Sequence, residues 1–279
     1  MPFKPINPRN AIVEASVIAH FNRPLSQIEG QAVRALHPQF RLDLPKLEVA
    51  PTMQINIGPP PPFPPAQPLT MAAYMRDGGL ETGLRLHGKM LVITFRAYTG
   101  WAELWPKAET WMCETLRAIS AATPQEAATP QENISPLAVV ALGHQIIDVF
   151  LWEGDPAAMK LPEIFREPSK RLPEDVWHAV GLQWFAAHST NTPDTTTNRA
   201  LIDFLALDLS EEPGLGLRLK LDHNLEMRFR EPMPPADCCK NVDATSLAGD
   251  IIGGLHSRNR ELMRTLLRPE MLSRVGMSP

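Results

Sequence analysis

The chain has 279 residues, which is enough to bury one large core or two smaller ones. Hydrophobic residues make up 44% and charged residues 21%, and this ordinary globular composition excludes a chain that is disordered or coiled-coil throughout. The formal net charge of −4 gives no overall attraction to nucleic acid or to an anionic membrane, so such a partner would need a local basic patch.

Cysteine usage indicates the compartment. Cys113, Cys238 and Cys239 are an odd, sparse set that makes a poor disulfide framework and favours a reducing environment. No apolar run of signal-peptide length follows Met1, and no stretch approaches the roughly 20 apolar residues that span a bilayer. We therefore expect a cytoplasmic protein without a membrane partner.

The first predicted elements are a strand and a short helix. Ile12 to Phe21 is rich in β-branched residues, which is typical of a strand. Ser26 with Glu29 three residues later is a capping-box pattern, so a helix should begin there and end at Pro38. Three residues are expected on its buried side: Ile28, Val33 and Leu36.

A proline run and a hairpin come next. Met53 to Ile57 predicts a short strand, and the prolines between 59 and 65 predict an extended, polyproline-like segment. That segment is either a ligand for a partner with an aromatic groove or a stiff surface loop. Leu80 to Leu86 and Lys89 to Arg96 predict a hairpin around His87-Gly88.

Trp101 to Ile119 predicts the clearest helix, because its apolar residues recur at steps of three and four. Pro106 is compatible with this helix if it lies in the first turn, where no backbone N–H is needed. Three tryptophans share the apolar stripe, which is interpreted either as a ligand box or as a face packed on a sheet.

A tandem hexapeptide marks the midpoint of the chain. Residues 121–126 read Ala-Ala-Thr-Pro-Gln-Glu and residues 127–132 repeat them. Without large apolar residues this segment predicts a surface linker, which we place at 121–133.

The second half predicts mostly strands. Leu137 to Trp152 is an apolar strand, and Val176 to Ser189 and Arg199 to Leu209 are two more, joined by a polar turn from Thr190 to Asn198. Gly216 to Leu221 and Leu225 to Arg230 predict a second hairpin. Thr245 to Leu267 predicts a closing helix, which Gly249, Gly253 and Gly254 weaken.

The two halves share a pattern. Gly83-Leu84-Arg85-Leu86 recurs as Gly216-Leu217-Arg218-Leu219, and each copy precedes a strand that ends in Phe-Arg and then a long helix. We therefore predict an α+β fold, a tandem repeat of two antiparallel-sheet units, each covered by a long amphipathic helix. The predicted divisions are residues 1–120, the linker 121–133, and residues 134–279.

The sequence contains no established catalytic, metal-binding or phosphate-binding motif. No two histidines have ligand spacing, the adjacent Cys238 and Cys239 lack a second cysteine pair, and no nucleophile elbow or phosphate-binding glycine loop is present. We predict neither metal nor cofactor. Asp203 and Asp208 should face opposite sides of one strand. Four residues remain as candidates for an unrecognised catalytic site: His144, Asp148, His223 and His256.

Basic residues gather near the C-terminus. This positive charge suits a phosphate backbone or an acidic protein, and the alternative is a solvated helix face. The candidate partner-binding residues are Arg258, Arg260, Arg264 and Arg268, with Arg274 beyond them.

The chain resembles a family of uncharacterised bacterial and archaeal proteins described as sporadically distributed. The resemblance covers almost the whole chain and rests on four segments: Val13-Glu14-Ala15, Tyr98-x-Gly100-Trp101, Leu255-His256 and residues 266–271. An arginine-tyrosine-x-asparagine pattern typical of the family is absent from the midpoint strand, where residues 142–147 stand instead. The resemblance implies a fold and a patchy occurrence that suits defence, toxin neutralisation or conflict with phages, and it implies no activity.

Three functions are therefore weighed. The first is a non-enzymatic module that binds another protein through its sheets and helices. The second is a nuclease or nucleotide-processing enzyme that uses the four candidate residues, if they converge in one cleft. The third is a nucleic-acid-binding regulator that uses the arginine-rich helix, if its basic face is continuous and unpaired. The sequence specifies neither the partner nor the oligomeric state.

Overall fold

The computed structural model describes residues 3–7, 10–50, 65–123, 136–155, 158–166, 184–194, 198–212, 214, 216–242 and 245–277. The expected strand at Met53 to Ile57, most of the proline run and most of the hexapeptide repeat lie outside these residues. Among the described residues, no helix is long and apolar enough to cross a membrane.

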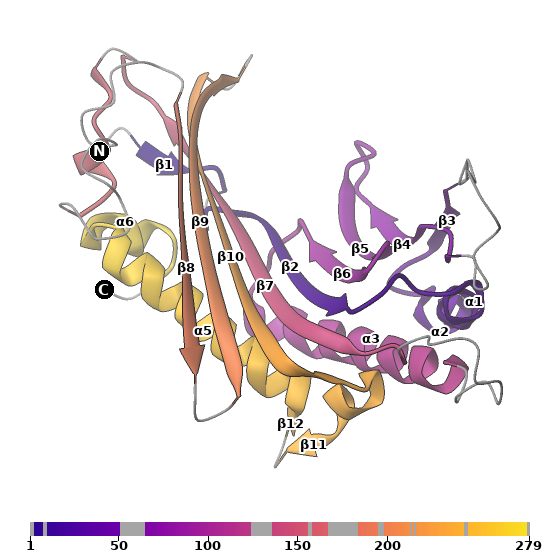
Figure 1. The fold of residues 1–279 in the computed structure, drawn as a ribbon. Helices are drawn as coiled ribbons and strands as arrows, with labels where there is room; N and C mark the ends of the chain where they lie inside the picture. Colours follow the sequence, from indigo (N-terminus) through magenta and orange to yellow (C-terminus); the bar gives the residue numbers. More distant parts are fainter. Residues whose placement is uncertain are drawn as a thin grey trace, which may run out of the picture.

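A bent antiparallel sheet of ten strands forms the framework (Figure 1). Its order is β3-β4-β5-β6-β2-β7-β10-β9-β8, and β1 also pairs with β7. The strands are β1 Phe3–Pro5, β2 Ile12–Phe21, β3 Lys46–Val49, β4 Leu69–Tyr74, β5 Leu80–His87, β6 Met90–Phe95, β7 Val139–Trp152, β8 Trp184–Asp194, β9 Arg199–Glu212 and β10 Gly216–Met233. A separate pair joins β11 Asn241–Val242 to β12 Thr245–Ser246.

Helices pack on one side of this sheet. The two long helices, α3 (Trp101–Ala122) and α5 (Leu247–Leu266), lie on the same side in Figure 1. The shorter ones are α1 (Gln27–Ala35), α2 (His37–Phe40) and α6 (Pro269–Arg274), together with the 3-10 turns η2 (Leu161–Glu163) and η3 (Pro235–Cys239). The structure is therefore a mixed α and β fold with a large antiparallel sheet, as predicted at that level.

The helices and the sheet enclose two apolar clusters. The first lies under α3, α1 and the beginning of α5, and includes Leu142 of β7. The second lies under the end of α5 and α6, and includes Phe150 of β7. Because α5 contributes Leu255 to the first cluster and Leu262 to the second, this one helix spans both.

Several local predictions hold. The first strand has the predicted bounds, Ile12–Phe21. The capping box of α1 is complete: Ser26 Oγ accepts from the backbone N–H of Glu29, and the Glu29 carboxylate accepts from that of Ser26. The buried side of α1 is different from the prediction, since Ile28 is 52% exposed whereas Glu29 is completely buried.

The predicted second hairpin is wrong. Residues 216–233 form one continuous strand, β10, which pairs with β9 on one side and with β7 on the other. Asp222 and Asn224 favour a turn, but the buried side chains on alternate residues continue through Leu221, His223 and Leu225. Long-range pairing on both sides outweighs the local turn preference. The predicted polar turn after Ser189 is also too long, because β8 continues to Asp194.

Helix boundaries differ in two further ways. Pro106 lies inside α3, beyond the first turn. The carbonyl of Ala102, which loses its N–H partner there, belongs to an exposed residue, where solvent can satisfy it. At its other end α3 includes Ala121 and Ala122, which the sequence places in the linker 121–133.

Candidate functional site

A layer of polar side chains lies between the two apolar clusters. We call it the buried polar layer, and all its members are buried. It consists of His144 and Asp148 on β7, Asp203 on β9, His223 on β10, and His256 and Asn259 on α5.

Strand alternation places this layer. On the helix-covered face of β7, His144 and Asp148 stand between Leu142 of the first cluster and Phe150 of the second. On α5, His256 and Asn259 are three residues apart and so lie on one side of the helix. They stand between Leu255 of the first cluster and Leu262 of the second. The layer therefore extends from the sheet to α5.

Two histidines of the layer form a chain of hydrogen bonds. His144 Nδ1 lies 3.1 Å from the carbonyl oxygen of Ser16, and its Nε2 lies 3.3 Å from Nδ1 of His256. Because a carbonyl only accepts, Nδ1 of His144 carries the proton and its Nε2 accepts from His256. Nε2 of His256 is then left with a lone pair, for which the described part of the chain supplies no partner.

The third histidine is held from both sides. His223 Nε2 lies 3.0 Å from Oδ1 of Asp203, and its Nδ1 lies 2.8 Å from Nδ2 of Asn259. The amide of Asn259 donates to Nδ1, so Nε2 carries the proton and donates to Asp203. Both ring nitrogens of His223 are thereby engaged, and neither is available to take a proton from a substrate.

Aromatic rings cover the histidine chain. The indole of Trp101, at the start of α3, stacks on His256 with ring centroids 4.2 Å apart and on Trp105 at 5.1 Å. Trp101 also lies 4.8 Å from the ring of His144. Trp101 thus connects the first turn of α3 to both β7 and α5.

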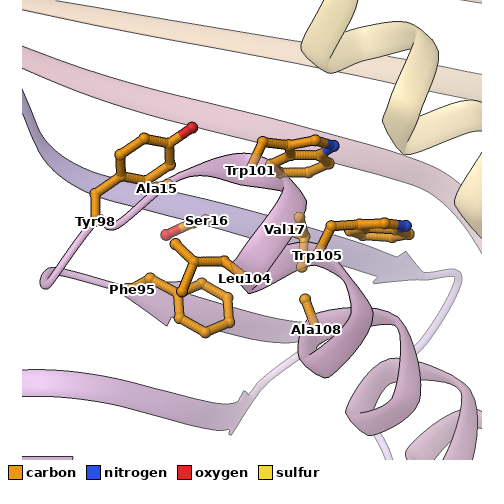
Figure 2. A pocket seen from close by; sticks show the side chains of 9 residues that line it. All are labelled: Ala15, Ser16, Val17, Phe95, Tyr98, Trp101, Leu104, Trp105 and Ala108. Carbon is orange, nitrogen blue, oxygen red and sulfur yellow. The ribbon is translucent and has the colours of Figure 1, made fainter. Parts of the chain in front are cut away.

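Tyr98 and Trp101 also line an apolar pocket beneath the start of α3 (Figure 2). The pocket is too narrow to hold a water molecule. Its lining comprises Ala15, Ser16, Val17, Phe95, Tyr98, Trp101, Leu104, Trp105 and Ala108.

Burial controls the protonation of the layer. Burial, together with the neighbouring His256, lowers the pKa of His144 to about 3. Burial and the Arg260 guanidinium lower the pKa of His256 to about 4. Burial raises the pKa of Asp148 to about 7, and burial with the Asp148 charge raises that of Tyr98 to about 12. At neutral pH both histidines are therefore uncharged.

The four candidate catalytic residues all lie in this layer. His144 and His256 are in direct contact, whereas His223 is bound to Asp203 and Asn259 instead. Asp148 is four residues along β7 from His144, on the same face, and is paired in register with Leu221. They converge inside the protein, between the sheet and α5.

Sequence reasoning missed three members of the arrangement. Asn259 is three residues from His256, so helical spacing was the available signal. Asp203 is buried on the helix-covered face while Asp208, as expected, points to the other face. Trp101 belongs to the segment Tyr98-x-Gly100-Trp101 that carried the family resemblance, and it contacts His256 of the segment Leu255-His256.

The basic residues do not form one unpaired face. Arg264 and Arg268 lie beside Glu261 and Glu270, at 3.8 and 3.7 Å. Arg258 and Arg260 are exposed and form no ion pair with the described residues. The positive charge of the helix is therefore concentrated at Arg258 and Arg260.

A metal centre has no support in the described segments, where no group of three or more His, Cys, Asp or Glu residues is arranged to hold a metal ion. Asp148 stands four residues along the same strand from His144, and Asp203 lies two strands across from His144, because Leu225 pairs with both His144 and Asp203. Comparison with known proteins gives no relative: no family model and no curated protein matches this chain, so the family resemblance remains a prediction.

Proposed function

We propose that this protein is a non-enzymatic binding module that holds another protein by pairing β8 with an extended segment of that partner. The observation that carries the proposal is the outer edge of β8. This 11-residue strand pairs along its whole length with β9, and no other described strand pairs with its second edge. Every second residue of such an edge directs its N–H and C=O groups away from the sheet.

The composition of β8 favours pairing. Natural edge strands are usually protected by being short, or by lysines, prolines, bulges or inward-pointing charges. The proline of β8, Pro193, stands one residue before the end of the strand. Residues 185–193 contain no Lys, Arg, Asp or Glu, and the register with β9 is uninterrupted. Phe185 is 67% exposed and offers an apolar anchor. The opposite edge, β3, is only four residues long and carries exposed Lys46 and Glu48.

The buried polar layer supports a scaffolding role. Its hydrogen bonds join β7, β9, β10 and α5, and β9 is the strand that pairs with β8. They engage every ring nitrogen of the three histidines except Nε2 of His256. A polar layer between two apolar clusters, with its histidines hydrogen-bonded in this way, favours one register of strands and helix over alternatives. We propose that it keeps the edge in a single conformation.

The proposed partner is a toxin, a defence effector or a phage component. The patchy occurrence implied by the family resemblance supports this class of partner. Extended segments that join a sheet edge gain affinity from backbone hydrogen bonds and selectivity from alternate side chains. An accessible backbone segment with an apolar residue facing Phe185 is the recognition element that we expect.

The test is affinity purification from the native host with matched variants. Phe185→Lys combined with Asn191→Lys introduces charges along the β8 edge. Leu42→Lys is the control, because Leu42 is 92% exposed and lies after α2 in the other half of the chain. We expect the natural protein and the control to recover one protein stoichiometrically, and the double variant to lose it while its thermal unfolding is unchanged.

Two results would contradict this function. Equal recovery by the double variant would show that β8 does not hold the partner. Recovery that is abolished by nuclease treatment would favour the nucleic-acid-binding alternative, in which the exposed Arg258 and Arg260 contact phosphates. In that case Arg258→Gln with Arg260→Gln should reduce binding and its salt dependence together.

We also infer that the two halves derive from one sheet-and-helix unit. In support, an early strand of each half pairs with the last strand that the half adds to the large sheet, β2 with β6 and β7 with β10, and a long helix follows each pair in the chain. The correspondence first suggested by Gly-Leu-Arg-Leu differs, because one copy lies in β5 and the other begins β10. In an experimental structure, one rotation should superpose β2, β6 and α3 on β7, β10 and α5. Helices that do not follow the strands in that rotation would refute the duplication.

A further inference from the structure

Cysteines from two distant parts of the sequence meet where α3 packs against η3. Cys113 lies in α3, and Cys238 and Cys239 lie in η3; all three are buried free thiols. Sγ of Cys239 lies 3.5 Å from the carbonyl oxygen of Cys113. On the same interface, Arg117 of α3 donates to the carbonyl oxygen of Cys239 at 3.3 Å. Two contacts thus hold residue 239 against α3.

We propose that Cys113 and Cys239 form an oxidation site at which a hydroperoxide converts the two thiols into a disulfide between α3 and η3. In the first step the Cys113 thiolate attacks the terminal peroxide oxygen and the O–O bond breaks. The other oxygen takes up the proton that Cys113 released on ionising and leaves as an alcohol or, from hydrogen peroxide, as water. Cys113 is then a sulfenic acid. Cys239 attacks its sulfur, the S–O bond breaks, and water leaves with the thiol proton.

The surroundings assign the two roles. The thiol of Cys239 lowers the pKa of Cys113, and the Ser246 hydroxyl and Arg117 contribute further, against the opposing effects of burial and of the Glu109 carboxylate. Glu109 accepts from the hydroxyl and the backbone N–H of Ser246, the N-cap of α5, so a carboxylate already occupies the positive end of that helix. Cys113, together with burial, raises the pKa of Cys239. Cys113 is therefore the attacking thiolate and Cys239 the resolving thiol.

Cys238 provides an internal control. Its Sγ lies 3.7 Å from Sδ of Met233, and burial raises its pKa to about 12. Its Sγ is therefore directed at Met233, whereas that of Cys239 is directed at Cys113. Lys240, which follows Cys239 directly, is exposed. Cys239 is thus only one residue from the surface, and hydrogen peroxide is nearly as small as water.

The experiment is to treat the folded protein with hydrogen peroxide, alkylate the remaining thiols under denaturing conditions and measure the intact mass and the linked peptides. Three single variants, Cys113→Ala, Cys239→Ala and Cys238→Ala, are compared after their cooperative thermal unfolding has been verified. We expect a disulfide that joins residues 113 and 239 in the natural protein and in Cys238→Ala, reversed by dithiothreitol. Neither of the other two variants should form that disulfide.

The reaction must also depend on the folded structure. The same protein in guanidinium chloride should form the 113–239 disulfide at least about tenfold more slowly, because Cys239 and Arg117 are no longer held beside Cys113 to activate it. Three results would overturn the proposal: no loss of free thiols in folded Cys238→Ala, a disulfide that includes residue 238 instead, or equal rates in the folded and unfolded chains.

Discussion

The indole of Trp101 lies parallel to the imidazole of His256, with ring centroids 4.2 Å apart and planes inclined by 8°. This contact joins the first turn of α3 to the middle of α5, and so connects the two halves of the chain at the buried polar layer. Because burial and Arg260 lower the pKa of His256 to about 4, the contact joins two uncharged rings at neutral pH.

Removing this ring should destabilise the whole fold. Trp101→Ala removes contacts to His256, His144 and Trp105, and we expect it to lower the free energy of unfolding by about 3 kcal/mol. Trp101→Phe keeps an aromatic ring there and should lower it by about 1 kcal/mol. Urea unfolding monitored by circular dichroism measures both. Equal effects of the two substitutions would show that the stacking is unimportant.

Stability should increase with pH between about 4 and 6.5. In this range the unfolded chain protonates His144 and His256 while the folded protein does not, and the folded protein alone keeps the proton of Asp148. The unfolded state thus binds one proton more, which corresponds to a rise of about 1.4 kcal/mol per pH unit. Urea unfolding at half-unit pH intervals checks this slope, and a stability that is flat from pH 4 to 6.5 would contradict the assigned protonation states.

Asp148 should have the opposite effect on the pH profile. A raised pKa makes the folded protein lose stability as pH increases from about 4 to its value of about 7. Asp148→Asn removes that loss, so the variant should gain up to about 4 kcal/mol relative to the natural protein between pH 4 and pH 8. The measurement is the difference in unfolding free energy between variant and natural protein at these two pH values. A difference that does not change with pH would rule out a neutral Asp148 below pH 7.

Truncating two neighbouring residues of α1 should change the stability by very different amounts. The buried carboxylate of Glu29 accepts from Arg23, from Thr123 and from the backbone N–H of Ser26, so Glu29→Ala should lower stability by about 3 kcal/mol. Ile28→Ala should change it by less than about 0.5 kcal/mol, because Ile28 is 52% exposed. Thermal unfolding of the two variants tests this burial against the apolar pattern of the sequence, which predicts that Ile28→Ala is the more destabilising substitution.

The pKa of Glu29 gives this site its own pH signature. Burial alone would raise it, but the Arg23 hydrogen bonds and the Ser26 and Thr123 donors outweigh burial and lower it. A lowered pKa contributes stability that is present at neutral pH and lost as pH falls through the acidic range. Glu29→Gln should therefore be most destabilising at neutral pH and approach the natural protein at low pH. The measurement is the free energy of unfolding of Glu29→Gln and of the natural protein at pH 3 and pH 7.

The sequence alone determined the elements whose signals are local. The β-branched run Ile12–Phe21, the capping box of Ser26 and Glu29, and the apolar stripe of α3 each depend on residues a few positions apart, and all three are present in the structure. Strand alternation likewise placed Asp203 and Asp208 on opposite faces.

The tertiary structure decided the rest, because burial and strand pairing depend on contacts between distant residues. His144 and His256 are 112 positions apart in the sequence, and no spacing rule relates them. Asp222 and Asn224 favour a turn locally, but hydrogen-bonded pairing of β10 with β7 on one side and β9 on the other keeps them in a strand. Glu29 is buried in place of Ile28 because Arg23 and Thr123 neutralise and satisfy a carboxylate there. Such compensation exists only once the chain has folded.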